Sequence, residues 1–152
     1  MYEPIRTKSV HTMAGAPSDF PHRSREEELD IQLAGHLAAL LAVTDELRAL
    51  VPSPALDESA ERVATQVGRL RGGGPPARAA VPAPAPGAAQ DTHARATALH
   101  RRAHALAGRA LVVAASRADT AAAILSAEQM DVHAHAARTA PAVTEPRQLA
   151  SH

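Results

Sequence analysis

The chain has no cysteine among its 152 residues. This absence excludes disulfide bonds, thiolate metal sites and a cysteine nucleophile. Aromatic residues are also scarce, with one phenylalanine, one tyrosine and no tryptophan, so the hydrophobic 45% is mostly alanine, leucine and valine. Because a buried alanine stabilises a fold far less than a large side chain, we expect a thin core that is reinforced by self-association.

The sequence also lacks long hydrophobic runs and an excess of charge of one sign. Arg109 and Arg117 interrupt the most apolar segment, which therefore falls short of the roughly 18 residues that a membrane span requires. Residues 1–23 lack the apolar core of a secretory signal, and this predicts a cytoplasmic protein. Sixteen basic residues balance sixteen acidic ones, which argues against a partner held by bulk charge.

Proline and glycine concentrate outside the periodic segments. Residues 1–23 and 139–152 show no hydrophobic period and are predicted to be disordered tails. The stretch GGGPPARAAVPAPAPGAAQ, residues 72–90, cannot be helical and is predicted to be a flexible linker. The expected domain organisation is a single helical domain, residues 24–138, interrupted by this linker.

Three helices are expected, over about 24–51, 53–71 and 91–138. Ser24 followed by Glu27 is a capping box, in which each side chain accepts a hydrogen bond from the backbone of the other residue. Pro52 ends the first helix, and Ser53 with Pro54 starts the second. The third segment has no proline before Pro141, and Gly108 is its expected weak point.

Apolar residues recur along each helix at spacings of three and four, as in coiled coils. The first two helices together match the third in length, so we expect them to lie end to end and antiparallel to it. This arrangement is an all-α, coiled-coil-like antiparallel hairpin that dimerises into a bundle, while Pro52 makes either a kink or a full reversal. The residues expected in packing or at the interface are Leu33, Leu37, Leu40, Leu47, Leu56, Val63, Val67, Leu70, Leu99, Leu106, Val113 and Ile124.

His100 and His104 are the first candidates for chemistry, because a spacing of four residues places both imidazoles on one helical face, as in zinc sites. In the expected hairpin, Asp57 and Glu61 lie opposite them and complete a possible metal site. The simpler interpretation is a solvated edge where these acids pair with Arg101 and its neighbours. A metal- or small-ligand-responsive protein is therefore the alternative hypothesis.

Arg95, Arg102 and Arg109 recur every seven residues and form a possible basic stripe for nucleic acid. The stripe lacks aromatic neighbours for base stacking, and the acidic first helix offsets its charge, which argues against nucleic acid as a partner. An intramolecular charge match with the first helix is the competing interpretation.

No residue pattern indicates an enzyme. The sequence has no Gly-x-Ser-x-Gly elbow, no phosphate-binding loop and no Glu-x-x-His pair for a di-iron centre. We therefore expect a non-enzymatic cytoplasmic interaction protein, an adaptor or regulatory scaffold that needs no cofactor and acts through homodimerisation and helix packing, with an unidentified protein as a further possible partner.

Overall fold

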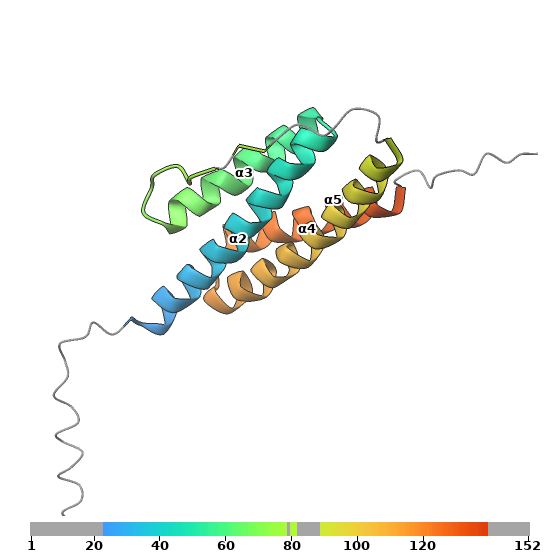
Figure 1. The fold of residues 1–152 in the computed structure, drawn as a ribbon. Helices are drawn as coiled ribbons and strands as arrows, with labels where there is room; N and C mark the ends of the chain where they lie inside the picture. Colours follow the sequence, from blue (N-terminus) through green and yellow to red (C-terminus); the bar gives the residue numbers. More distant parts are fainter. Residues whose placement is uncertain (1–22, 79, 82–88, 140–152) are drawn as a thin grey trace, which may run out of the picture.

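The computed structural model describes residues 23–78, 80–81 and 89–139. In this part of the chain every regular element is an α-helix: α2 (Arg25–Leu50), α3 (Pro54–Leu70), α4 (Ala89–Arg117) and α5 (Thr120–Thr139) (Figure 1). The all-α fold class is thus confirmed, whereas the count of three helices is wrong. The expected tails lie outside the described residues, apart from residues 23 and 139. None of the four helices has an apolar stretch long enough to cross a bilayer.

Local sequence signals place the start of α2 and of α3. The Glu27 amide donates to Ser24 Oγ at 3.0 Å and the Ser24 amide donates to Glu27 Oε1 at 2.9 Å, so the expected capping box is present. The Leu56 amide donates to Ser53 Oγ at 3.1 Å, and Pro54 occupies the first turn of α3. These caps satisfy backbone donors that have no partner inside a helix.

Pro52 marks a full reversal, so the expectation that the first two helices lie end to end is wrong. The helices α2 and α3 pack side by side, and Arg48 near the end of α2 donates to Asp57 in the first turn of α3 at 2.8 Å. A proline disfavours the helical conformation at the preceding residue and cannot continue the hydrogen-bond ladder. The reversal lets the apolar stripes of both helices face each other.

The expected third helix breaks at Ala118 and Asp119, not at Gly108. Ala118 has a left-handed φ of 60°, the Asp119 amide donates to Ala114 O at 2.9 Å, and the Ala118 amide donates to Ala115 O. This pattern is a Schellman motif with alanine where glycine is usual. The Ala122 amide then donates to Asp119 Oδ1 at 3.1 Å, which caps the start of α5.

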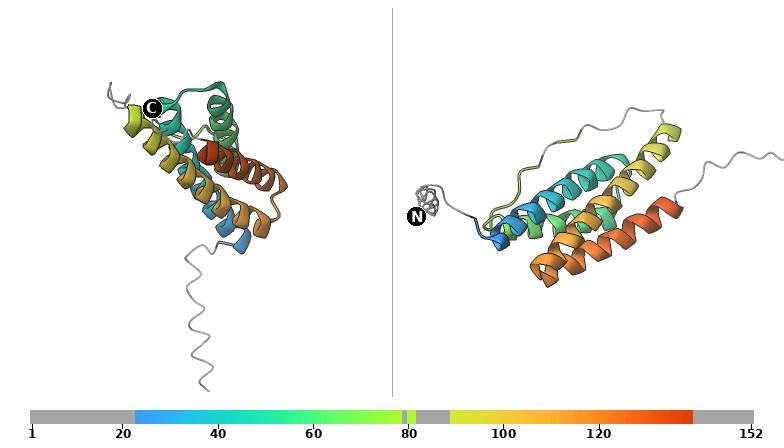
Figure 2. Two further views of the ribbon diagram at one scale, coloured as in Figure 1. Left: turned by 90° about the vertical axis from the view of Figure 1, so that its right-hand side faces the viewer. Right: turned by 90° about the horizontal axis from the view of Figure 1, so that it is seen from below.

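The four helices form a bundle in which α2 lies between α3 and α4, α4 packs against α5, and α3 and α5 make only a narrow contact (Figures 1 and 2). The helices α2 and α4 are antiparallel, because Arg117 donates to Asp30 at 3.0 Å near one end of the pair and Arg95 donates to Glu46 near the other. The core centres on α2, whose four fully buried leucines are Leu33, Leu37, Leu40 and Leu47. The expected coiled-coil pairing is not the arrangement observed.

The first part of the expected linker comes directly after α3 in the chain and packs back against the α2–α3 hairpin. Gly72 and Gly73 have φ values of 101° and 107°, which other residues rarely adopt, and the Gly73 amide donates to Gly68 O at 2.6 Å. The chain passes so close to α3 that a Cβ atom at Gly68 would lie 2.7 Å from Gly74 O. We call the described residues 71–78 the strap. The remainder of the expected linker includes residue 79 and residues 82–88, which lie outside the described residues.

Candidate functional site

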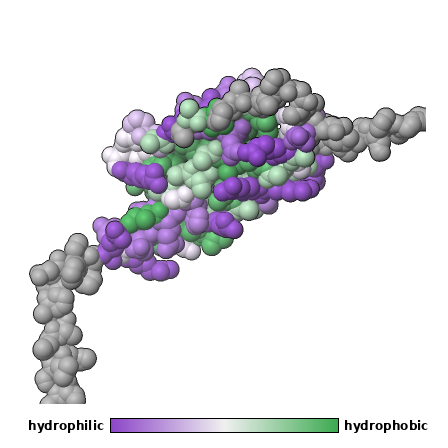
Figure 3. Space-filling model, in the orientation of Figure 1, coloured by the Kyte–Doolittle hydropathy of each residue, from purple (hydrophilic) through white to green (hydrophobic). Residues whose placement is uncertain are grey.

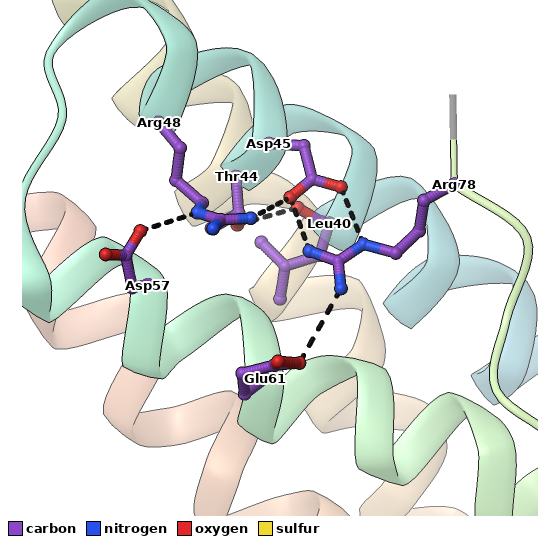
Figure 4. A network of polar contacts seen from close by, with 7 residues as sticks. All are labelled: Leu40, Thr44, Asp45, Arg48, Asp57, Glu61 and Arg78. Carbon is purple, nitrogen blue, oxygen red and sulfur yellow. Dashed lines mark hydrogen bonds and ion pairs between the residues drawn. The ribbon is translucent and has the colours of Figure 1, made fainter. Parts of the chain in front are cut away.

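Asp57 and Glu61 do not face His104 and His100, so the hairpin register expected from the sequence is wrong. Both acids lie on the exposed side of α3 (Figure 4). Asp57 accepts from Arg48, and Glu61 forms an ion pair of 3.6 Å with Arg78 of the strap. The cause is the reversal at Pro52, which turns α3 back along α2 and away from α4.

Asp45 is the centre of this ionic network (Figure 4). It accepts from Arg78 Nε at 3.0 Å and Nη2 at 2.7 Å, and from Arg48 Nη1 at 2.9 Å. Partial burial acts to raise the pKa of the Asp45 carboxyl, but the hydrogen bonds and charges of Arg78 and Arg48 outweigh it and lower the pKa. Asp45 therefore stays ionised and holds the strap on the α2–α3 hairpin, which is a structural role.

His100 and His104 face α5 instead. His100 Nδ1 lies 2.9 Å from Nδ1 of His133, and His104 Nδ1 donates to Met130 O at 3.0 Å. Among the described residues, no three or more His, Cys, Asp or Glu side chains are placed to hold one metal ion. The four side chains of the expected metal site therefore do not converge.

A third histidine, His133, was not singled out as a site residue from the sequence. It is 0% exposed and belongs to the inner face of α5, with the buried Ser126 and Gln129. Gln129 Nε2 donates to Ser59 Oγ of α3 at 3.2 Å. Within the described part of the chain, Ser126 Oγ, Gln129 Oε1 and His133 Nε2 have no hydrogen-bond partner. The spacing of these three residues, three and then four, was a signal for a shared helical face.

Burial, followed by the charges of His100 and His104, lowers the pKa of His133 to about 4. Burial also lowers the pKa of His100. In the contact between them one Nδ1 donates and the other accepts, so the geometry requires at least one neutral imidazole. Both rings are therefore neutral near pH 7.

Most residues expected at a dimer interface are used inside the single chain. Nine of them are buried in its core: Leu33, Leu37, Leu40, Leu47, Leu56, Val63, Val67, Leu99 and Leu106. Leu70 and Val113 are half-buried against the same core, and Ile124 is 54% exposed. The apolar stripes that first indicated a dimer therefore already have partners, and any interface must use other side chains.

The arginines expected to form a basic stripe lie on the exposed side of α4. They belong to a series at spacings of three and four, which we call the outer row of α4: Arg95, Ala98, Arg102, Ala105, Arg109, Val112 and Ser116, all exposed. Arg95 donates to Glu46, as the charge-match interpretation expected. Arg102 and Arg109 form no ion pair with any described residue. The expected charge match is therefore only partial.

The helix α2 contributes a similar row of residues to the same face. The outer row of α2 consists of Arg25, Glu28, Gln32, Gly35, Ala39, Ala42 and Glu46, each exposed or half-buried. The Arg95–Glu46 pair joins the two rows at one end of the face. Residues 31–44 of α2 contain no acid, so Arg102 and Arg109 lie beside a stretch that cannot neutralise them.

Comparison of the chain with models of protein families, with characterised proteins and with solved structures finds no match. The face formed by the two outer rows is the candidate functional site because it carries two exposed arginines, Arg102 and Arg109, without an ion pair to any described residue, beside small exposed side chains.

Proposed function

We propose that this chain is a non-enzymatic cytoplasmic interaction protein that works by self-association. The proposal rests on the exposed and uncompensated pair Arg102 and Arg109 on the face between α2 and α4. Some arginines of the described helices are held by acids, for example Arg48, Arg62, Arg69 and Arg117. A charged row without intramolecular partners favours a function in which another acidic surface is bound.

The outer rows also have the side chains that helix packing requires. Ala98, Ala105, Gly35 and Ala42 are small and exposed, which permits close approach of another helix. Val112 is 66% exposed and supplies an apolar contact beside them. Separate hydrophilic clusters with hydrophobic and small residues between them are visible on the surface in Figure 3. This mixture is typical of a non-obligate protein interface.

The test is the mass of the full-length chain in solution. We expect size-exclusion chromatography with light scattering at micromolar concentration and low salt to give about twice the 15.8 kDa of one chain. Near 1 M salt, where charges are screened beyond about 3 Å, the dimer should dissociate. A monomer at both salt concentrations would contradict the proposal.

Nucleic acid is the second candidate, because Arg102 and Arg109 remain available to phosphates. It is the weaker one, since Glu46 already neutralises Arg95 and exposed aromatic side chains for stacking are absent from the described residues. Fluorescence anisotropy with a labelled DNA duplex separates the two. Salt-sensitive DNA binding by a monomer would replace self-association as the proposed function.

A further inference from the structure

We propose that the second copy docks on the face between α2 and α4 across a two-fold axis, with Glu28 of each copy against Arg109 of the other. The inference rests on the proposed function and adds the surface, the symmetry and the contact. A two-fold interface is self-complementary, so each pair of contacting residues occurs twice.

The register of α2 against α4 determines where the charges lie. The two ion pairs show that Arg95 lies at the same level along the helix axes as Glu46, and that Arg117 lies at the same level as Asp30. Interpolating between these pairs places Arg109 level with Gly35, about 10 Å along the helix axis from Glu28 at about 1.5 Å per residue. The acidic and basic parts of the face are therefore offset, and one copy cannot pair them internally.

A two-fold axis perpendicular to the helices removes this offset. If Glu28 meets Arg109 of the second copy, the axis passes midway between their levels, close to Gln32. Val112 lies within about one helical turn of that level. The centre of the contact then holds an exposed valine from each copy, and the ion pairs lie on either side of it. Apolar centres with charged rims are the usual arrangement of specific interfaces.

The local charges favour this pairing. Glu28 belongs to the acidic first turn of α2 with Glu26 and Glu27, and its contact with Arg23 is long at 3.9 Å and exposed. The acidic first turn of α2 therefore lies opposite Arg109 of the second copy, whereas Arg102 lies about two turns beyond it, near the level of Arg25. Bringing Glu28 against Arg109 gives this arginine an acidic partner that its own copy does not supply.

Charge reversal tests the contact directly. Arg109→Glu and Glu28→Arg should each raise the dimer dissociation constant about tenfold or more, since each change affects two contacts. The double variant re-forms both ion pairs in reversed order and should return to within about threefold of the original chain. Arg138→Glu on α5 and Glu58→Arg on α3 are exposed controls that should leave the dissociation constant unchanged.

The outcomes separate the inference from the proposed function. If the chain is a dimer but the double variant is no tighter than the single variants, the contact is wrong and self-association stands. If the original chain is a monomer, both are wrong. Circular dichroism of each variant checks that the helices remain, and only variants with full helicity are compared.

The absence of cysteine allows an independent test by cross-linking. Gln32→Cys places a thiol close to the two-fold axis and should form an intermolecular disulfide on mild oxidation, because disulfides require Cα atoms within about 7 Å. Ala98→Cys lies on the same face but far from the axis, and it should remain a monomer on a non-reducing gel. Equal cross-linking of both variants, or none at Gln32→Cys, would overturn the two-fold contact.

Discussion

The polar ring of His133 is buried at a place that offers it too few hydrogen-bond partners. Its ring is fully buried, one nitrogen contacts His100, and the other has no partner among the described residues. A buried polar atom without a hydrogen bond destabilises a fold by about 1–3 kcal/mol. With Ser126 and Gln129, His133 makes the inner face of α5 the least satisfied part of the core, and this face borders the narrow contact with α3.

The pH dependence of stability follows from the lowered pKa of His133. The unfolded chain takes up a proton near pH 6.5, whereas the folded chain does so only near pH 4, so the unfolded state binds more protons between these values. The free energy of unfolding should therefore be unaffected by this group above pH 6.5, and it should fall as the pH decreases from 6.5 toward 4. For this group the slope is at most about 1.4 kcal/mol per pH unit.

His133→Leu should flatten this slope and raise stability at pH 5, because leucine brings no proton site and no unpaired nitrogen. Urea unfolding followed by circular dichroism at several pH values measures both effects. His135→Gln is the control, since His135 is exposed. An unchanged slope in His133→Leu would show that other groups govern the acid response.

Replacing Gly68 and Gly108 by alanine should change the free energy of unfolding in opposite directions. In a helix interior alanine is usually favoured over glycine by about 1 kcal/mol. At Gly108 the new Cβ would lie 3.6 Å from Met130 Cε, an ordinary contact, so we expect stabilisation. At Gly68 it would lie 2.7 Å from Gly74 O, a backbone atom, so the strap must move.

Gly68→Ala should therefore lose stability despite its better helix propensity, and it should increase hydrogen exchange in residues 71–78. Urea unfolding of both variants and exchange measured by mass spectrometry test this. Equal stabilisation by both substitutions would mean that the strap does not press on α3.

The helices differ in how far their boundaries could be predicted. The starts of α2 and α3 follow from side chains that cap them, Ser24 and Ser53, and their positions were predicted correctly. The boundary between α4 and α5 was missed because Ala118 adopts a left-handed conformation that alanine rarely takes. Asp119 before Thr120 was a possible cap, but nothing in the surrounding alanine-rich sequence required the helix to stop there.

Ala118→Gly should stabilise the chain by about 1 kcal/mol, because glycine has no steric cost at positive φ. Asp119→Ala should destabilise it by about 1 kcal/mol through loss of the cap on α5, and it also removes the 2.7 Å ion pair with Arg69. Thermal and urea unfolding of the two variants give these values. A stabilising Asp119→Ala would indicate that α4 and α5 can join into one helix.

The bundle as a whole depends on α2 and α4, the two described helices that each pack extensively against two others: α2 against α3 and α4, and α4 against α2 and α5. The leucines of α2 are the largest core side chains in an otherwise alanine-rich interior. The outer faces of α2 and α4 have no further helix of the described chain against them. Stability and the proposed association therefore use opposite sides of the same helices.

Leu40→Ala should destabilise the fold by about 2–5 kcal/mol, because a fully buried leucine at the centre of α2 leaves a cavity. Ile124→Ala, at an exposed position of α5, should change stability by less than about 1 kcal/mol. Urea unfolding in high salt, where we expect the dimer to dissociate, measures the stability of the single chain alone. Similar losses in the two variants would contradict the observed burial.

The sequence by itself determined the all-helical class, the cap at the start of α2, the cap at the start of α3 and nine residues of the apolar core on α2, α3 and α4. These features depend on contacts between near neighbours or on hydrophobic period, which are local properties. Only the tertiary structure decided that Pro52 reverses the chain, that α5 folds back on α4, and that His100 meets His133. It also decided that Arg109 lies beside an acid-free part of α2, because the level of one helix against another depends on the packing of all of them.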